Sequence, residues 1–144
     1  GTYGGYSTIN MAKFSPPAAK IYTIDNYIYT TKPDLTWLDA YPELLAKITF
    51  IEADTATYDF IRNGLTDFDL IFIDGNHQTS YVAADSRLAF QLIKPTGTIV
   101  WHDWYRYDNG AVSDITVAVE ALGYRPKAIG EQLAFLSPLS VGSY

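Results

Sequence analysis

Four short apolar segments, separated by helical patterns, constrain the fold of this chain more than any other feature. They run over residues 21–25, 48–54, 69–75 and 97–103. Their apolar residues are consecutive instead of alternating, which is typical of strands buried on both faces of a parallel sheet. Strands that alternate with helices predict βαβ units, whose right-handed crossovers place helices on both faces of the sheet.

The helical patterns cover residues 7–14, 35–48, 55–61, 80–93 and 111–122, and Thr55 is a plausible N-cap for the third. Two further strand candidates, Lys127–Gly130 and Leu133–Leu136, are separated by a short polar pair and predict a closing hairpin. We therefore expect an α/β, doubly wound, mainly parallel sheet with helices on both faces and a C-terminal antiparallel hairpin. A length of 144 residues fits one domain over residues 1–144.

Composition excludes several classes of function. The formal net charge is −6 and no Lys/Arg cluster is present, which argues against nucleic acid or an anionic membrane as partner. The chain has no cysteine, so disulfides and thiol chemistry are excluded. It has no apolar run long enough to span a bilayer and no secretory signal pattern. We expect a cytoplasmic protein that acts on a small-molecule substrate and that is a possible homo-oligomer.

Acidic residues end all four predicted strands. Asp25, Asp54 and Asp74 end the first three, and His102-Asp103 ends the fourth. Ligands of open α/β sheets bind outside the carboxyl ends of the strands. We therefore expect these four acids to line one edge of one sheet and to mark the functional site.

A glycine-rich segment, residues 1–8, precedes the first helix. Glycines allow the backbone to approach a ligand, and a helix N-terminus offers free N–H groups. Asp25 follows at the end of the next strand, where an acid binds ribose hydroxyls in nucleotide-binding βαβ units. The alternatives are an ordinary turn for the loop and a helix cap or turn residue for Asp25. Asp54 has two interpretations as well, an acceptor for an exocyclic amine or a helix cap.

Both histidines of the chain lie at predicted strand ends, in Asp74-Gly75-Asn76-His77 and in His102-Asp103-Trp104. Carboxylates together with imidazoles suit a divalent cation or a general base. The alternative is that the acids cap the following helices and the histidines are solvated.

Together these segments resemble class I S-adenosylmethionine-dependent methyltransferases, in particular the small-molecule O-methyltransferases that include catechol and macrolide-sugar enzymes. The most specific part of the likeness is the combination of residues 72–77 with residues 92–103. The resemblance implies methyl transfer from S-adenosylmethionine to a small-molecule acceptor, expected to be a hydroxyl oxygen.

The resemblance also implies roles for individual residues in cofactor binding. The methionine part would be lined by the glycine-rich loop, the ribose would be held by Asp25 with Asn26 beside the adenine, and Asp54 would face the adenine amine. The loop residues concerned are Gly1, Tyr3 and Gly5.

The remaining implied roles concern the reacting centre. Asp74 would lie near the sulfonium and, with Asp103, would bind Mg²⁺ in metal-dependent members. Those members have Asn where this chain has Trp104. His77 or His102 would then replace it as ligand or act as the base, so we expect His77, Asp74 and His102 to be catalytic.

The family also has a central strand ahead of its glycine-rich loop, and this sequence has none. We expect the chain to be N-terminally incomplete, or another segment or partner chain to take that position in the sheet. Two other functions stay open. Asp25 would also serve an NAD-dependent oxidoreductase, although no Tyr-x-x-x-Lys pair is present, and the missing strand favours a non-catalytic or degenerate cofactor-binding domain.

Overall fold

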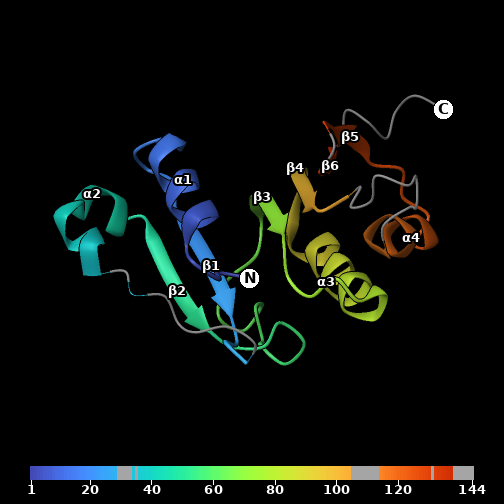
Figure 1. The fold of residues 1–144 in the computed structure, drawn as a ribbon, viewed down its shortest axis with the longest axis horizontal. Helices are drawn as coiled ribbons and strands as arrows, with labels where there is room; N and C mark the ends of the chain where they lie inside the picture. Colours follow the sequence, from blue (N-terminus) through green and yellow to red (C-terminus); the bar gives the residue numbers. More distant parts are fainter. Residues whose placement is uncertain (29–33, 35, 105–113, 131, 138–144) are drawn as a thin grey trace. The chain divides into compact units, whose positions relative to one another are not determined.

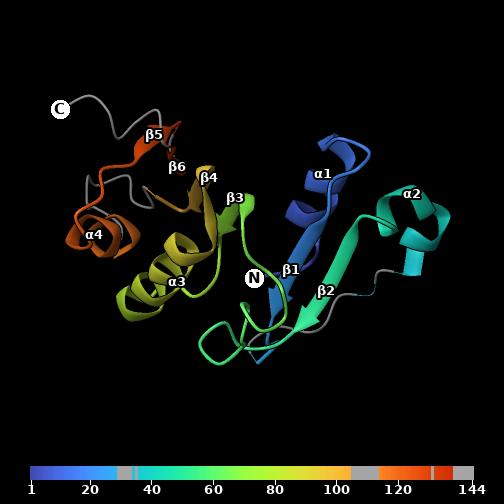
Figure 2. The same cartoon turned by 180° about the vertical axis from the view of Figure 1, so that it is seen from behind.

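The structure, a computed structural model, describes residues 1–28, 34, 36–104, 114–130 and 132–137. The chain divides into two compact units, Gly1–Tyr58 (unit 1) and Asp59–Tyr144 (unit 2). Figure 1 shows the elements of both units in chain order, and Figure 2 shows them from behind. This division does not test the expectation of one domain over residues 1–144, which stays a prediction.

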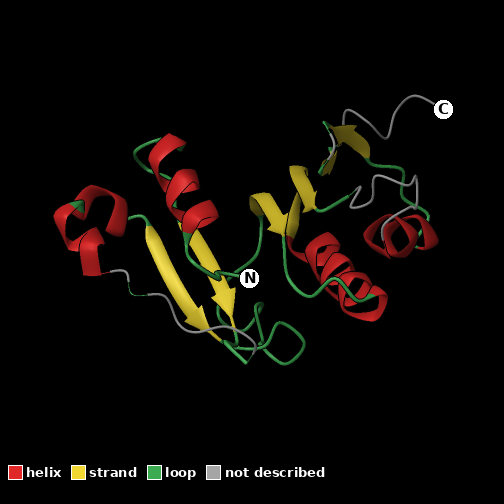
Figure 3. Ribbon diagram, in the orientation of Figure 1, coloured by secondary structure: helices red, strands yellow, loops and turns green. Residues whose placement is uncertain are grey.

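Unit 1 contains a two-stranded parallel sheet with helical segments (Figure 3). Strands β1 and β2 pair in register from Ile21 opposite Ile48 to Asp25 opposite Glu52. The first strand has the bounds that the sequence predicts, because its β-branched and aromatic residues favour extended backbone. The elements of the unit are α1 (Tyr6–Phe14), β1 (Ile21–Asp25), the 3₁₀ helix η1 (Thr36–Ala40), α2 (Pro42–Leu45) and β2 (Ile48–Glu52).

The single helix predicted over residues 35–48 is wrong, since η1 and α2 are separate elements. Pro42 occupies the start of α2, and Tyr41 before it has a non-helical backbone at φ −129° and ψ 64°. A residue that precedes proline is pushed out of the helical region by the pyrrolidine ring. The proline therefore starts a new helix instead of continuing the previous one.

The helix predicted over residues 55–61 is also wrong, because this segment forms turns. The Asp54 side chain accepts the Ala56 N–H at 2.8 Å, and the Asp59 side chain accepts the Arg62 N–H at 2.9 Å. Such local bonds from side chain to backbone compete with the helical pattern. Asp54, and not Thr55, is the capping residue of the first turn.

Unit 2 contains a four-stranded mixed sheet in the order β3-β4-β6-β5. The pair β3–β4 is parallel, whereas β6 is antiparallel to both β4 and β5. The predicted closing hairpin is thus confirmed. The elements are β3 (Phe68–Ile73), α3 (Thr79–Leu92), β4 (Ile93–His102), α4 (Asp114–Ala121), β5 (Lys127–Ile129) and β6 (Leu133–Leu136). No helix in the described part of the chain is long and apolar enough to cross a membrane.

The core of unit 2 lies between its sheet and the pair α3 and α4, which pack on one another. Trp101 of β4 is fully buried, and its Nε1 donates to the buried Ser86 Oγ of α3 at 3.0 Å. This bond satisfies the one polar atom of the largest core side chain. Strand β4 and the middle of α3 are therefore held together one residue before β4 ends at His102.

Strand β4 begins at Ile93, four residues before the predicted start at Gly97. Gly97 allows this, since a Cβ there would lie 2.6 Å from the Ile93 side chain and 2.8 Å from the Phe68 carbonyl oxygen. Contacts under 3.0 Å with backbone force the chain to shift. Only glycine lets β4 run this close to β3.

Two expectations about the strands differ from the structure. β1 and β3 are not buried on both faces, because Tyr22 is 37% exposed and Leu70 is 49% exposed. In each unit one helix packs on these strands, α1 on β1 and α3 on β3, so one face keeps exposed side chains.

The strands that the sequence predicts in one sheet form two separate sheets in the described residues. Asp25 and Asp54 follow strands of the two-stranded sheet, whereas Asp74 and Asp103 follow strands of the four-stranded one. The described residues contain no strand ahead of α1.

Candidate functional site

In unit 1 the carboxylate of Asp25 organises the glycine-rich loop. Its Oδ2 accepts the backbone N–H groups of Thr2 at 2.8 Å and Tyr3 at 3.0 Å, and its Oδ1 accepts that of Tyr27 at 2.8 Å. Tyr3 and Gly5 both have positive φ, 45° and 79°. Two successive amides, those of Thr2 and Tyr3, thus donate to one carboxylate oxygen. The predicted partnership between loop and acid is present as a direct contact.

Three buried threonines anchor the same loop and helix α1 to β1. Thr23 Oγ1 lies 2.8 Å from Thr2 Oγ1 and accepts the hydroxyl of Thr8 at 3.0 Å. All three side chains are buried. Hydrogen bonds among buried hydroxyls avoid the cost of unsatisfied polar groups and hold the loop in one position. Sequence reasoning missed this cluster, because isolated threonines carry no pattern.

The pKa of Asp25 lies below its ordinary value of 3.8. Partial burial raises it, but the backbone hydrogen bonds from Tyr3, Tyr27 and Thr2 together outweigh that effect. A carboxylate offers roughly four lone-pair positions, and these amides occupy three. Asp25 is therefore ionised at neutral pH with room for about one further donor.

The other predicted residues of unit 1 surround this loop. Asn26 Oδ1 accepts the Ile28 N–H at 3.2 Å, and Asp54 caps its own turn. The Ala53 N–H donates to the Asp25 backbone oxygen at 3.0 Å, which places Asp54 beside the end of β1. Tyr3 is 69% exposed. Gly1 and Gly5 belong to the same loop, so the structure gathers all six unit 1 residues at the carboxyl end of β1 and β2.

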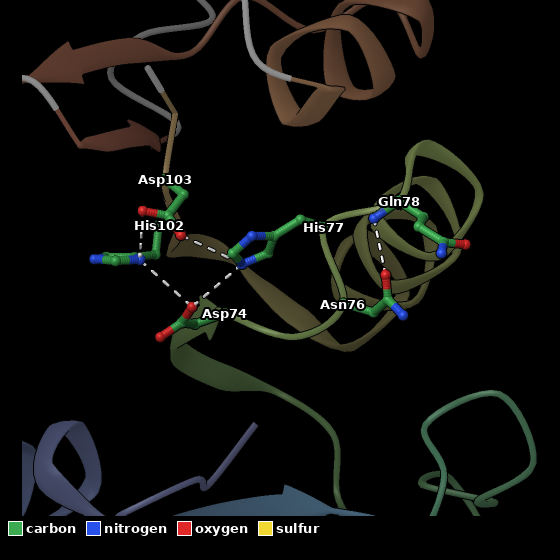
Figure 4. Close-up of polar contacts among 6 residues, drawn as sticks. All are labelled: Asp74, Asn76, His77, Gln78, His102 and Asp103. Atoms are coloured by element: carbon green, nitrogen blue, oxygen red, sulfur yellow. Dashed lines mark hydrogen bonds and ion pairs between the residues drawn. The ribbon is translucent and has the colours of Figure 1, made fainter. Parts of the chain in front are cut away.

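In unit 2 four side chains from the ends of β3 and β4 converge, as Figure 4 shows. His77 Nε2 lies 3.4 Å from Asp103 Oδ2 and 3.9 Å from Asp74 Oδ1. His102 Nδ1 lies 3.3 Å from Asp103 Oδ1 and 3.4 Å from Asp74 Oδ1. We call these four residues the reactive cluster. Their side chains are between 20% and 33% exposed, so the cluster is accessible but partly desolvated.

The segment between β3 and α3 holds His77 in place. Asn76 Oδ1 accepts the Gln78 N–H at 2.8 Å and turns the chain into α3 (Figure 4). His77 is the central residue of this turn, and its ring points back toward Asp74 and Asp103. The turn therefore places the His77 ring beside both carboxylates.

Donor atoms of Asp74, His102 and Asp103 all lie within 4.8 Å of one another, close enough to share one ion. The sequence predicts Asp74 and Asp103 as ligands and leaves either His77 or His102 as a further one. The structure groups His102 with the two acids. His102 Nδ1 is buried and has no hydrogen-bond partner among the described residues.

Trp104, where the resemblance described above implies an Asn ligand in metal-dependent methyltransferases, does not join the cluster. Its side chain is 2% exposed and packs in the core of unit 2. Its backbone N–H donates to the Gln132 oxygen at 3.1 Å, and its backbone oxygen accepts the Thr116 hydroxyl at 2.9 Å. Trp104 therefore anchors the chain after β4 and offers no ligand atom.

Comparisons with known proteins agree with this arrangement. A family model described as a methyltransferase domain matches residues 1–104. Catechol O-methyltransferase B of Danio rerio is 29% identical over an alignment of 96 residues, which covers 61% of this chain and 33% of the relative. The chain thus spans about a third of the length of the curated relative that it matches.

Solved structures show the fold. A proposed rRNA methylase from Clostridium thermocellum has a TM-score of 0.67 at 13% identity, over 95% of this chain and 84% of the other. The TDP-rhamnose 3'-O-methyltransferase CalS11 has a TM-score of 0.67 at 12% identity, over 95% and 69%. The O-methyltransferase TomG of Streptomyces achromogenes, solved with S-adenosylmethionine, has a TM-score of 0.56 at 16% identity, over 94% and 69%. The predicted Rossmann-like fold is confirmed.

Proposed function

The chain belongs to the methyltransferase family whose model matches residues 1–104, and on this premise we propose that it transfers the methyl group of S-adenosylmethionine to a hydroxyl oxygen of a small molecule. The observation that carries the choice of oxygen is the reactive cluster, in which two imidazoles and two carboxylates meet at the ends of β3 and β4. A hydroxyl is a poor nucleophile until it loses its proton, and this cluster offers an acceptor for that proton.

The glycine-rich loop and the acids beside it are the proposed binding site for the cofactor, which supplies an electrophilic methyl group when it is bound. Asp25 is ionised and keeps room for about one hydroxyl donor, so it binds one ribose hydroxyl. Asp54 accepts the adenine amine, and Asn26 lies beside the ring. The methionine part is assigned to Gly1, Tyr3 and Gly5.

His77 is the proposed general base. Its Nε2 lies 3.4 Å from Asp103 Oδ2, so Asp103 orients the ring and stabilises the imidazolium that forms when His77 takes a proton. The ring is 30% exposed, which leaves it accessible to an acceptor molecule. His102 is the second candidate for this role, but its Nδ1 is buried between two carboxylates.

Mg²⁺ is a further candidate at Asp74 and Asp103. Their carboxylate oxygens suit this ion. The third donor of the group, however, is the His102 imidazole, and Mg²⁺ prefers oxygen. The residues present therefore fit a transition-metal ion better than they fit Mg²⁺, so no step of the proposed reaction passes through Mg²⁺.

The remaining proposals concern partners and location. A net charge of −6 supports a small-molecule acceptor over nucleic acid or a membrane surface. A cytoplasmic location and a possible homo-oligomer stay predictions. An NAD-dependent oxidoreductase is not favoured by the family, and a degenerate binding domain is the competing outcome of the experiment below.

The test is methyl transfer from labelled S-adenosylmethionine to catechols and to sugar hydroxyls by the full-length protein, with product identified by mass spectrometry. We expect an O-methyl product with the unmodified chain and its loss with His77→Gln. Lys94→Gln is the matched control, because it removes only an exposed ion pair with Asp69 in the same unit. Binding of adenosylhomocysteine without any transfer would identify a degenerate domain, and binding of NAD instead would support the oxidoreductase.

A further inference from the structure

We infer that His102 Nδ1 is the third ligand of a divalent metal ion held by Asp74 and Asp103, and that the site takes a transition-metal ion such as Co²⁺ or Zn²⁺ in preference to Mg²⁺. This rests on the proposed function, since the ion would lie in the same reactive cluster. It goes beyond the sequence prediction by choosing His102 over His77 as the ligand and by naming a different class of ion.

The donor distances match ligands that share one ion. Metal–nitrogen and metal–oxygen bonds are about 2.0–2.2 Å, so two ligands of one ion lie roughly 3.0–3.4 Å apart. His102 Nδ1 lies 3.4 Å from Asp74 Oδ1 and 3.3 Å from Asp103 Oδ1. The two edges of the ligand triangle that involve His102 therefore have the length that coordination requires.

The backbone at Asp103 explains how two consecutive residues reach one point. Successive side chains of a strand point to opposite faces, so His102 and Asp103 should diverge. Asp103 instead has a φ of 53°, in the left-handed region that non-glycine residues seldom adopt. This turn ends β4 and brings the Asp103 carboxylate to the same side as the His102 ring.

A contact with an aromatic ring also holds the ring of His102 in place. Phe72 of β3 packs edge-on against it with ring centroids 6.1 Å apart. Figure 4 shows Nδ1 turned toward both carboxylates and the other ring nitrogen turned away from them. A buried Nδ1 without a hydrogen-bond partner faces two carboxylate oxygens. Lone pairs so arranged repel unless a cation or a proton lies between them.

The mixture of donors determines the class of ion. Carboxylates alone suit Mg²⁺ and Mn²⁺, whereas imidazole suits Zn²⁺, Fe²⁺, Ni²⁺ and Cu²⁺. One imidazole with two carboxylates therefore favours the transition metals over Mg²⁺. The two histidines then have separate roles, because Asp103 presents Oδ1 to His102 and Oδ2 to His77.

Calorimetric titration of the full-length protein with Co²⁺ and with Mg²⁺, without cofactor or acceptor, tests the site. We expect Co²⁺ to bind more tightly than Mg²⁺, and His102→Asp to reduce this preference by about tenfold or more, since it replaces the nitrogen ligand by oxygen. His77→Gln is the matched control, because it removes an imidazole that contacts the ligand Asp103 without being a ligand itself. It should lower the affinities for both ions alike and leave their ratio unchanged within about threefold. An unchanged ratio in His102→Asp, or equal affinity for the two ions, overturns the inference.

A second measurement needs no substitution. The chain has two histidines, so ¹⁵N spectra of the histidine rings resolve both. Addition of Zn²⁺ should shift the Nδ1 resonance of His102 to the metal-bound range and leave both His77 nitrogens outside it. Zn²⁺ ligation by His77 alone, or by neither ring, contradicts the assignment. Intact metal binding without methyl transfer would instead overturn only the proposed function, and transfer with a Mg²⁺-selective site would overturn only this inference.

Discussion

Carboxylates at strand ends occur in both units, yet their surroundings differ. In unit 1 three backbone amides surround Asp25. In unit 2 Asp74 and Asp103 face imidazole nitrogens of His77 and His102 instead. Amide donors fix a carboxylate in its ionised form and tie it to the backbone, whereas imidazoles leave proton or metal chemistry open. The same residue type at equivalent places thus becomes an organiser of a loop in one unit and part of a reactive cluster in the other.

The largest effect should come from His77→Gln. Glutamine keeps a polar side chain of similar length but cannot accept a proton, so we expect methyl transfer to fall by about 10²–10⁴-fold. Binding of adenosylhomocysteine, measured by calorimetry, should be unchanged within about threefold. Full turnover in this variant would assign the base elsewhere and weaken the contrast between the two units.

Asp25→Ala should affect both the stability of the chain and its affinity for the cofactor. It leaves the amides of Thr2, Tyr3 and Tyr27 without their acceptor. We expect adenosylhomocysteine binding to weaken by about 1–3 kcal/mol. Urea unfolding should show reduced stability in the same variant. Unchanged affinity together with reduced stability would mean that Asp25 organises the loop but does not touch the ligand.

Low pH should reduce the stability of unit 1 through protonation of Asp25. Because the pKa of Asp25 is lower in the folded chain than its ordinary 3.8, its stabilising contribution is complete above that pH and is lost as the pH falls through the folded value. Unfolding free energies at pH 6 and pH 3 should differ less in Asp25→Asn than in the unmodified chain. An identical pH dependence in both would show that other groups dominate acid unfolding.

The smallest effect should come from Asp54. Asp54→Asn keeps an oxygen that accepts the Ala56 N–H, so stability should change by less than about 0.5 kcal/mol. Asp54→Ala removes this acceptor and should cost about 0.5–1 kcal/mol in urea unfolding, the scale of an exposed local hydrogen bond. If Asp54→Asn also leaves adenosylhomocysteine affinity unchanged, the carboxylate charge of Asp54 has no part in binding.

Much of the local structure could be predicted from the sequence. Residues 21–25, 80–92 and 133–136 form the expected strand, helix and strand, because their apolar spacing and β-branched content agree with their surroundings. Prediction failed where single residues overrode the pattern. Pro42 divides the helix predicted over residues 35–48 into two elements. The side chains of Asp54 and Asp59 stabilise turns where a helix was predicted over residues 55–61.

The sequence by itself determined which side chains end the strands and therefore which residues were candidates for chemistry. Only the tertiary structure decided which of them meet. His102 and Trp104 both adjoin Asp103 in the chain, but only His102 joins the cluster. The positive φ at Asp103 brings the carboxylate beside the His102 ring, and Trp104 is buried in the core. Such a choice depends on backbone geometry and core packing across β3, β4 and α4, which a linear pattern of residue types does not contain.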